Sequence, residues 1–331
     1  MSAAGPRLSL LDLATVGRDQ PVGEALETSV VLAQKADELG AFERLWFAEH
    51  HNMPSIASAA TAVLLAHVAA RTERIRVGSG GVMLPNHSPL VIAEQFGTLA
   101  ELHPGRIDLG LGRAPGTDQV TMRALRADPR ASDRFPDDVL ELRGYLSDES
   151  LVPTINAIPG RGTRVPLYIL GSSLFGAQLA ARFGLPYAFA SHFAPDALQQ
   201  AVEVYRREFQ PSEQLAEPHV IAALNVVVAD EQDHAEALAA SVLRSRVRSL
   251  ASRVPAYAGR LDDAAVDALM DSPVAAQARH MMTYSAVGDL ESVRDYLVRF
   301  AEHARADELM VTNAAPGLDN RLRALELLAS P

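Results

Sequence analysis

The chain has 331 residues, a formal net charge of −11 at pH 7 and no cysteine. Hydrophobic residues make up 48% of it and charged residues 21%, which excludes a disordered chain, a collagen-like chain and a disulfide-stabilised miniprotein. Without cysteine there is no thiolate nucleophile, cysteine-ligated zinc or iron–sulfur cluster. No run of Lys and Arg offers a surface for nucleic acid. The apolar run at residues 8–11 is too short for a signal peptide or a membrane span, so we expect a cytoplasmic protein with no membrane partner.

Short apolar runs alternate with helically spaced segments along the chain. In the first 115 residues, strands are predicted at 8–13, 44–48, 75–84 and 106–111, with helices at 22–39, 59–70 and 90–102. The alternation resumes with strands at 167–170, 187–190, 220–229 and 308–312. Eight such repeats favour a closed α/β barrel, the (β/α)8 or TIM barrel, over an open doubly wound sheet. We therefore expect one domain over residues 1–331.

Two regions interrupt this alternation, at about residues 128–164 and 249–284. Both are rich in Pro, Gly and Asp, and the first contains one helical segment at 137–146. Long insertions in a barrel lie on loops, where they form lids or stay mobile. The second is interpreted either as a cover over the active-site end or as a packing appendage or dimer contact.

Polar and glycine residues follow the predicted strands, and in a barrel these strand ends converge on one mouth. Ser172 and Ser173 open the helix predicted at 174–183, where backbone N–H groups favour an anion, and Arg113 follows the fourth strand. Together they predict a phosphate-bearing cofactor, although an ordinary helix cap and a surface ion pair remain the alternatives. Gly80 and Gly81 at the third strand indicate either close contact with a flat ligand or a bulge.

Glu49, His50 and His51 follow the second strand. Adjacent residues of a strand point to opposite faces, so the two histidines are not expected to ligate one metal ion. One of them is predicted to face the mouth as a general acid or base, and the other to be structural.

Several segments, in this order and spacing, resemble the bacterial luciferase-like flavin monooxygenases. They are FAEHHN at 47–52, VGSGGVMLP at 77–85, PGRIDLGLGRAPG at 104–116, the Gly171-Ser172-Ser173 turn, and the segments at 287–289 and 307–310. The similarity runs nearly end to end, and it is strongest to the short single-chain bacterial branch, with LLDL at 10–13 and LPNHSP at 84–89.

The resemblance implies a luciferase-like (β/α)8 barrel that binds reduced FMN, with O2 adding to the flavin to give a peroxide that oxygenates an organic substrate. It implies a non-proline cis peptide at Gly80–Gly81 under the flavin ring, phosphate contacts from Arg113, Ser172 and Ser173, and a catalytic His50 beside its structural neighbour Glu49. It also places three further residues near the ring or the substrate: His87, Ser191 and His192. Gly176 departs from the pattern, because relatives often carry a hydroxyl there.

No Gly-x-Gly-x-x-Gly follows the first strand, so reduced flavin is expected from a separate NAD(P)H-dependent reductase. A homodimer is predicted through the helices after strands 2 and 3, whose Ala-rich stretch runs from Ala57 to Ala70. Apolar candidates at the mouth indicate a substrate with substantial hydrocarbon character: Leu11, Phe47, Met83, Phe193, Met281 and Met282. Three alternatives remain open: a deazaflavin (F420)-dependent oxidoreductase, a non-catalytic flavin-binding protein and a metal-dependent barrel hydrolase.

Overall fold

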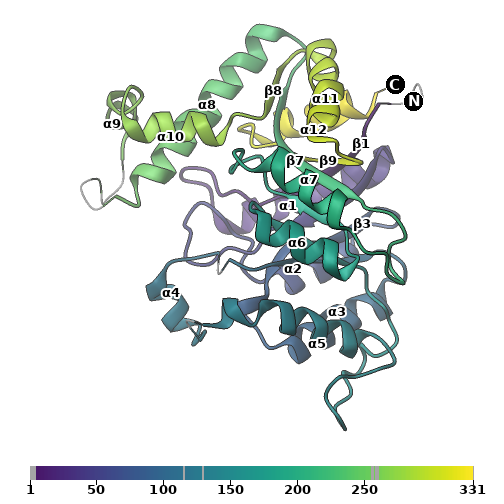
Figure 1. Cartoon of the computed structure of the whole chain (residues 1–331). Coiled ribbons are helices and arrows are strands. Elements are labelled where there is room, and N and C mark those ends of the chain that lie inside the picture. Colours follow the sequence, from purple (N-terminus) through teal and green to yellow (C-terminus); the bar gives the residue numbers. More distant parts are fainter. Residues whose placement is uncertain (1–4, 115, 129, 255–256, 258–260, 331) are drawn as a thin grey trace.

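A computed structural model describes residues 5–114, 116–128, 130–254, 257 and 261–330 (Figure 1). Eight parallel strands form a closed ring in which β9 pairs with both β1 and β7. These strands are β1 (Arg7–Asp12), β2 (Phe42–Phe47), β3 (Arg76–Met83), β4 (Ile107–Gly112), β5 (Leu167–Gly171), β6 (Tyr187–Phe189), β7 (Val220–Val228) and β9 (Glu308–Thr312). The predicted (β/α)8 barrel is confirmed.

Helices surround this ring and connect its strands (Figure 1). They are α1 (Val22–Leu39), α2 (Thr61–Ala69), α3 (Pro89–Leu102), α4 (Gln119–Ala124), α5 (Phe135–Leu146), α6 (Leu174–Phe183), α7 (Leu198–Glu208), α11 (Leu290–Ala304) and α12 (Leu318–Ala329), with short 3-10 turns at Leu84–Asn86 and Ala131–Asp133. Helices α1 and α6 each end at a glycine in the left-handed region, Gly40 and Gly184, whose N–H groups bond back to the last turn. No helix in the described ranges is long and apolar enough to cross a membrane.

Side chains fill the interior of the barrel in layers. Near the amino ends of the strands, Arg44 bonds to Glu308 (Nε–Oε1, 2.8 Å) and to Asp108 (Nη1–Oδ2, 2.8 Å). Above this charged layer lies an apolar one, formed by Leu11, Trp46, Ala48, Tyr168, Ala188, Ile221, Ala223 and Met310. Because the described interior is packed, a ligand would lie outside it, and in barrels of this kind sites lie at the carboxyl ends of the strands.

The first interruption, at residues 128–164, belongs largely to the framework. Helix α5 lies within it and buries Phe135, Val139 and Leu142 in the main core together with Phe96 of α3. Residue 129 lies outside the described residues.

The second interruption is part of a longer excursion between β7 and α11. It consists of α8 (Gln232–Ala251), α9 (Asp263–Ala268), α10 (Pro273–Met281) and β8 (Ser285–Gly288), and we call residues 232–288 the arm. The ninth strand, β8, was not predicted and pairs with β7 outside the ring. The arm has a small core of its own around Val247, Val266 and Ala278. Two of the residues that make this region rich in Pro and Gly, Pro255 and Gly259, lie outside the described residues.

Both ends of the arm meet at one place. The N–H of Ala229 donates to the carbonyl of Gly288 at 3.2 Å, and the N–H of Asp289 donates to Oε1 of Gln232 at 3.2 Å. Figure 1 shows α8, α9 and α10 projecting from the barrel on the same side as α4, which follows the carboxyl end of β4. The arm also contacts the loop after β1 through an Arg18–Asp263 ion pair of 3.0 Å. It therefore stands beside the mouth of the barrel.

Candidate active site

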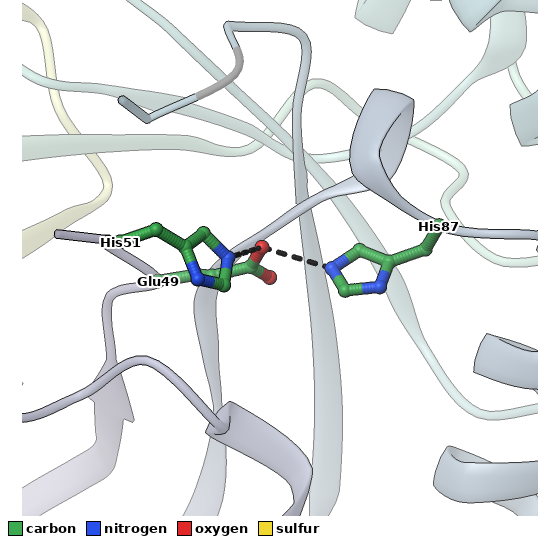
Figure 2. Close-up of side chains that lie close together, drawn as sticks. All are labelled: Glu49, His51 and His87. Carbon is green, nitrogen blue, oxygen red and sulfur yellow. Dashed lines mark hydrogen bonds and ion pairs between the residues drawn. The ribbon is translucent and has the colours of Figure 1, made fainter. Parts of the chain in front are cut away.

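Glu49, just beyond β2, is a hydrogen-bonding centre at the mouth. Its Oε1 accepts hydrogen bonds from Nε2 of His51 at 2.9 Å and Nε2 of His87 at 2.8 Å, and Figure 2 shows the two rings on either side of the carboxylate. Its Oε2 accepts from the backbone N–H of Met83 at 3.1 Å. Burial opposes ionisation of this side chain, which is 2% exposed, but the hydrogen bonds from His87 and His51 outweigh it and hold the pKa of the Glu49 carboxyl below its ordinary value. Because a carboxylate only accepts hydrogen bonds, both Nε2 atoms carry a proton.

From the sequence, we compared His50 with His51 as metal ligands and missed that His51 and His87 bond to the same carboxylate, that of Glu49. The ligand atoms of Glu49, His51 and His87 all lie within 4.8 Å of one another. Ligands of a tetrahedral zinc ion, each about 2.0 Å from the metal, are about 3.3 Å apart. The two N–O distances of 2.8 and 2.9 Å are instead those of hydrogen bonds. The three side chains therefore form a hydrogen-bonded network that fixes both histidine rings and links the loops after β2 and β3.

His50 has a different environment from His51. Its backbone N–H bonds to the carbonyl of Ser58 at 3.1 Å, and its ring Nδ1 is buried with no hydrogen-bond partner in the part of the chain that is described. Burial, followed by the positive charge of Arg253, lowers the pKa of the His50 imidazole. The ring is therefore neutral at pH 7.

His192, two residues beyond the Ala190 that ends the predicted sixth strand, matches His50 in two respects. Its Nδ1 is also buried without a hydrogen-bond partner among the described residues. Burial, with the charges of Arg246 and His50 adding to it, lowers the pKa of His192 to about 3. Since buried polar atoms are normally hydrogen-bonded, two unpartnered ring nitrogens near each other indicate a place for a ligand with polar edges.

Two other predicted residues have framework contacts. The Ser191 hydroxyl is fully buried and donates to the carbonyl of Ala223 at 2.5 Å, which ties the end of β6 to β7. Phe47, expected at the mouth, is fully buried in the core between barrel and helices. That expectation is wrong because side chains alternate along a strand, and Trp46 takes the inward position. Phe193 is exposed and lies edge-to-face on the His192 ring.

Gly80 and Gly81 are joined by a non-proline cis peptide bond, as the resemblance implies. The register between β3 and β4 shifts here, between Ser79 and Val82, so the glycine pair also marks a bulge. A Cβ at Gly80 would lie 2.8 Å from Cδ1 of Leu11, and one at Gly81 would lie 2.7 Å from the carbonyl oxygen of Gly110. Only glycine fits at either position without displacing its neighbours.

Arg113, Ser172 and Ser173 come together at the ends of β4 and β5. The Arg113 guanidinium carbon lies 4.1 Å from the ring centroid of Phe175, in the first turn of α6. Ser173 is the N-cap residue of that helix, yet its side chain makes no capping hydrogen bond, and no hydrogen bond involves the Ser172 hydroxyl in the described ranges. A guanidinium and two hydroxyls without hydrogen-bond partners among the described residues thus lie beside a helix N-terminus, a combination suited to a phosphate.

Gly176, where the sequence departs from the family pattern, packs tightly against Tyr187. A Cβ there would lie 3.2 Å from Cε2 of Tyr187, whose hydroxyl donates to the carbonyl of Ser173 at 3.0 Å. A side chain at position 176 would therefore require the Tyr187 ring to shift by a few tenths of an ångström.

A barrel with an uncapped helix start beside an arginine, a glycine doublet and two neutral histidines at its mouth has the features of a cofactor-dependent enzyme. Comparison with known proteins identifies the class: the chain belongs to the luciferase-like monooxygenase family, whose model matches residues 7–308. A luciferase-like monooxygenase of Escherichia coli K12 is 45% identical over 96% of this chain and 95% of its own. An N-acetyl-S-alkylcysteine monooxygenase of Bacillus subtilis is 37% identical over 70% of each chain. The protein is therefore an oxidoreductase of the monooxygenase type.

Solved structures share this architecture. The crystal structure of apo-MsnO8 is 35% identical, with a TM-score of 0.86 over 98% of this chain and 97% of that one. Two more distant structures, each 16% identical, show the fold alone. One is the oxygenating constituent of 3,6-diketocamphane monooxygenase of Pseudomonas putida in complex with FMN, with a TM-score of 0.69 over 98% of this chain and 96% of that one. The other is an F420-dependent secondary alcohol dehydrogenase in complex with an F420–acetone adduct, with a TM-score of 0.68 over 99% and 100%.

Proposed function

We propose that the protein uses reduced FMN and O2 to place one oxygen atom on a small organic substrate. The family supports oxygenation, and distant members of the fold are named for FMN or for F420. The observation that carries the FMN proposal is the meeting of Arg113 with the uncapped start of α6. Two hydroxyls, a guanidinium and free N–H groups at one point match the charge and hydrogen-bonding capacity of a phosphate monoester.

The remaining residues fit the flat part of such a cofactor. Gly80 and Gly81 offer backbone without side chains at the mouth, and His50 and His192 offer unpartnered ring nitrogens near it. Bound reduced flavin supplies the electrons that activate O2. The packed barrel interior below the mouth helps to keep water away from the reaction.

We assign His50 the proton-transfer role. Its imidazole is neutral at pH 7, so it is ready to accept a proton and to return it later. Glu49 does not serve as that base, because its two oxygens are occupied by His51, His87 and the Met83 N–H. Glu49 is a positioning residue that fixes the loop from which His50 projects.

The phosphate assignment is tested by binding. Purified protein is titrated with FMN, riboflavin and F420, and we expect FMN to bind more tightly than either. Arg113→Met should weaken FMN binding about tenfold or more, because charge-assisted bonds contribute about 1.5–3 kcal/mol, and should leave riboflavin binding unchanged. Arg182→Met, an exposed change at the far end of α6, is the matched control. Tighter binding of F420 than of FMN would replace the proposal with hydride transfer by a deazaflavin.

We also propose that a separate NAD(P)H-dependent reductase supplies the reduced flavin. No Gly-x-Gly-x-x-Gly fingerprint follows β1 in the sequence. In an assay with NADH, FMN and O2, product formation should require an added flavin reductase. Full turnover by the purified chain with NADH alone would contradict this.

A further inference from the structure

Arg246 of α8 reaches from the arm to the ends of β6 and β7 with only neutral partners. Its Nη1 donates to the carbonyl of His192 at 3.3 Å, and its Nη2 donates to Oδ1 of Asn225 at 3.4 Å. No carboxylate within the described ranges lies within ion-pair distance of it. Both hydrogen bonds are long, so neither holds the guanidinium strongly.

Most shielded guanidiniums in the described ranges have a carboxylate partner. Arg44 is paired with Glu308 and Asp108, Arg321 with Asp12, and Arg206 with Asp307. Arg106 has no such partner among the described residues, but it makes short hydrogen bonds to neutral oxygens, 2.8 Å from Nη1 to the carbonyl of Thr72 and 2.6 Å from Nη2 to the Thr72 hydroxyl. Burial lowers the pKa of the Arg246 guanidinium, and no neighbouring carboxylate opposes the effect. A sheltered charge without a counter-charge is costly, which indicates that an anion from outside the chain completes the site.

A second cation of the arm lies on the same side of the mouth. The Nη2 of Arg253 contacts Sδ of Met53 at 3.6 Å. The positive charge of Arg253 contributes to the lowered pKa of the His50 imidazole. Arg253 too has no carboxylate partner among the described residues. Two guanidiniums therefore flank His50 and His192, both neutral, and the nearby acid Glu49 is occupied by its own hydrogen bonds. In a chain with a net charge of −11, this is a local positive region beside the reacting groups.

We propose that the substrate carries a carboxylate and that Arg246 binds it, an inference that rests on the proposed function. The planar fork of the guanidinium matches a carboxylate in bidentate fashion, and the hydrocarbon remainder of the substrate would lie at the mouth beside Phe193. The cofactor phosphate has its own site at β4 and β5, whereas Arg246 stands over β6 and β7. The arm thereby becomes the element that recognises the substrate.

The test compares two ligands of equal shape and different charge. FMN-loaded protein is titrated calorimetrically with octanoate and with octanamide, for the wild type, Arg246→Met and Arg279→Met. Arg279 belongs to the same arm but bonds to the carbonyl of Met270, so its replacement is the matched control. We expect wild type and control to bind octanoate about tenfold more tightly than octanamide, and Arg246→Met to lose this preference while keeping its FMN affinity.

Other outcomes overturn the proposal. One is equal binding of the two ligands by the wild type. Another is no binding of either ligand up to about 10 mM, a range that is still measurable as roughly −3 kcal/mol. A third is a preference for octanoate that survives in Arg246→Met. A loss of FMN affinity in Arg246→Met would assign the anion to the cofactor instead. Arg246→Lys, which keeps the charge without the fork, should retain part of the preference and guards against a misfolded Met variant. The same titrations on FMN-free protein separate failure of the carboxylate site from failure of FMN binding.

Discussion

At the residue scale, neighbouring histidines differ through their contacts. His51 is fixed by Glu49, whereas His50 has a buried, unpartnered nitrogen and a pKa lowered by burial and by Arg253. The sequence motif predicted that one histidine would face the reaction and the other would be structural, because successive side chains on a strand diverge. It could not predict that His87 shares the same carboxylate, because that contact joins residues 38 positions apart.

Replacing His50 tests its assigned role. His50→Ala should lower the rate of substrate oxygenation about 10²-fold or more, the usual contribution of a general acid or base, and should change FMN affinity much less. His67→Ala, an exposed change in α2, should have no effect on either quantity. The measurements are product formation with reduced FMN and equilibrium FMN binding. Unchanged turnover in His50→Ala would remove it from the mechanism, and a wild type that binds FMN without consuming O2 would be a carrier.

At the scale of elements, regular strands and helices were predictable and irregular ones were not. The eight ring strands follow apolar runs and agree with prediction to within two residues at each end. Strand β8 has only four residues, alternately buried and half-buried, and pairs outside the ring, so its apolar signal is weak. The arm arginines were missed for another reason: Arg246 lies on a helix with no motif, and only the fold brings it to His192.

The close approach of β3 and β4 depends on Gly110. A Cβ there would lie 2.2 Å from the carbonyl oxygen of Ser79 and 2.7 Å from Cδ1 of Leu170. Gly110→Ala should therefore lower the free energy of unfolding by about 1–3 kcal/mol and weaken FMN binding, because β3 carries the glycine doublet. Gly23→Ala in α1, where a Cβ meets open space, is the control and should be neutral or slightly stabilising. Urea unfolding curves check both variants, and equal stability of the two would contradict the packing account.

At the scale of the whole molecule, the charged layer inside the barrel makes stability depend on pH. Burial disfavours the Glu308 carboxylate, but hydrogen bonding from His219 and the charge of Arg44 outweigh burial and lower the pKa of Glu308 to about 2 from 4.5. A lowered native pKa means that ionised Glu308 stabilises the fold at pH values above 4.5. This stabilisation is lost as the pH falls from 4.5 through about 2.

Glu308→Gln should lower the free energy of unfolding at pH 7 by about 3–5 kcal/mol, because Arg44 loses one of its two buried counter-charges. The variant should also lose less stability than the wild type between pH 4.5 and pH 3. Glu302→Gln, an exposed change in α11, should match the wild type in both respects. Urea unfolding at pH 7, 4.5 and 3 provides the comparison, and an unaltered pH dependence in Glu308→Gln would show that other groups control acid stability.

The surface of α2 and α3 supports the expectation of a homodimer. Val63 of α2 is 72% exposed and Leu102 of α3 is 65% exposed, and Val91 of α3 is also exposed. We predict that the chain sediments as a dimer at micromolar concentration and that Val63→Asp shifts it to a monomer, since a charge in an apolar contact is destabilising. Val298→Asp, at an exposed valine of α11, should leave the dimer intact. Sedimentation of the wild type as a monomer would reject the interface.

The arm begins and ends at adjoining residues beside β7, so the ring keeps its strand spacing whatever lies between them. We therefore expect residues 232–288 to be exchangeable between relatives as one segment, provided that the pairing of β8 with β7 is kept. From the proposed role of Arg246, we expect such a chimaera to take its substrate preference from the donor of the arm and its FMN site from the recipient. Diversification of chemistry on this scaffold then requires no redesign of the barrel itself.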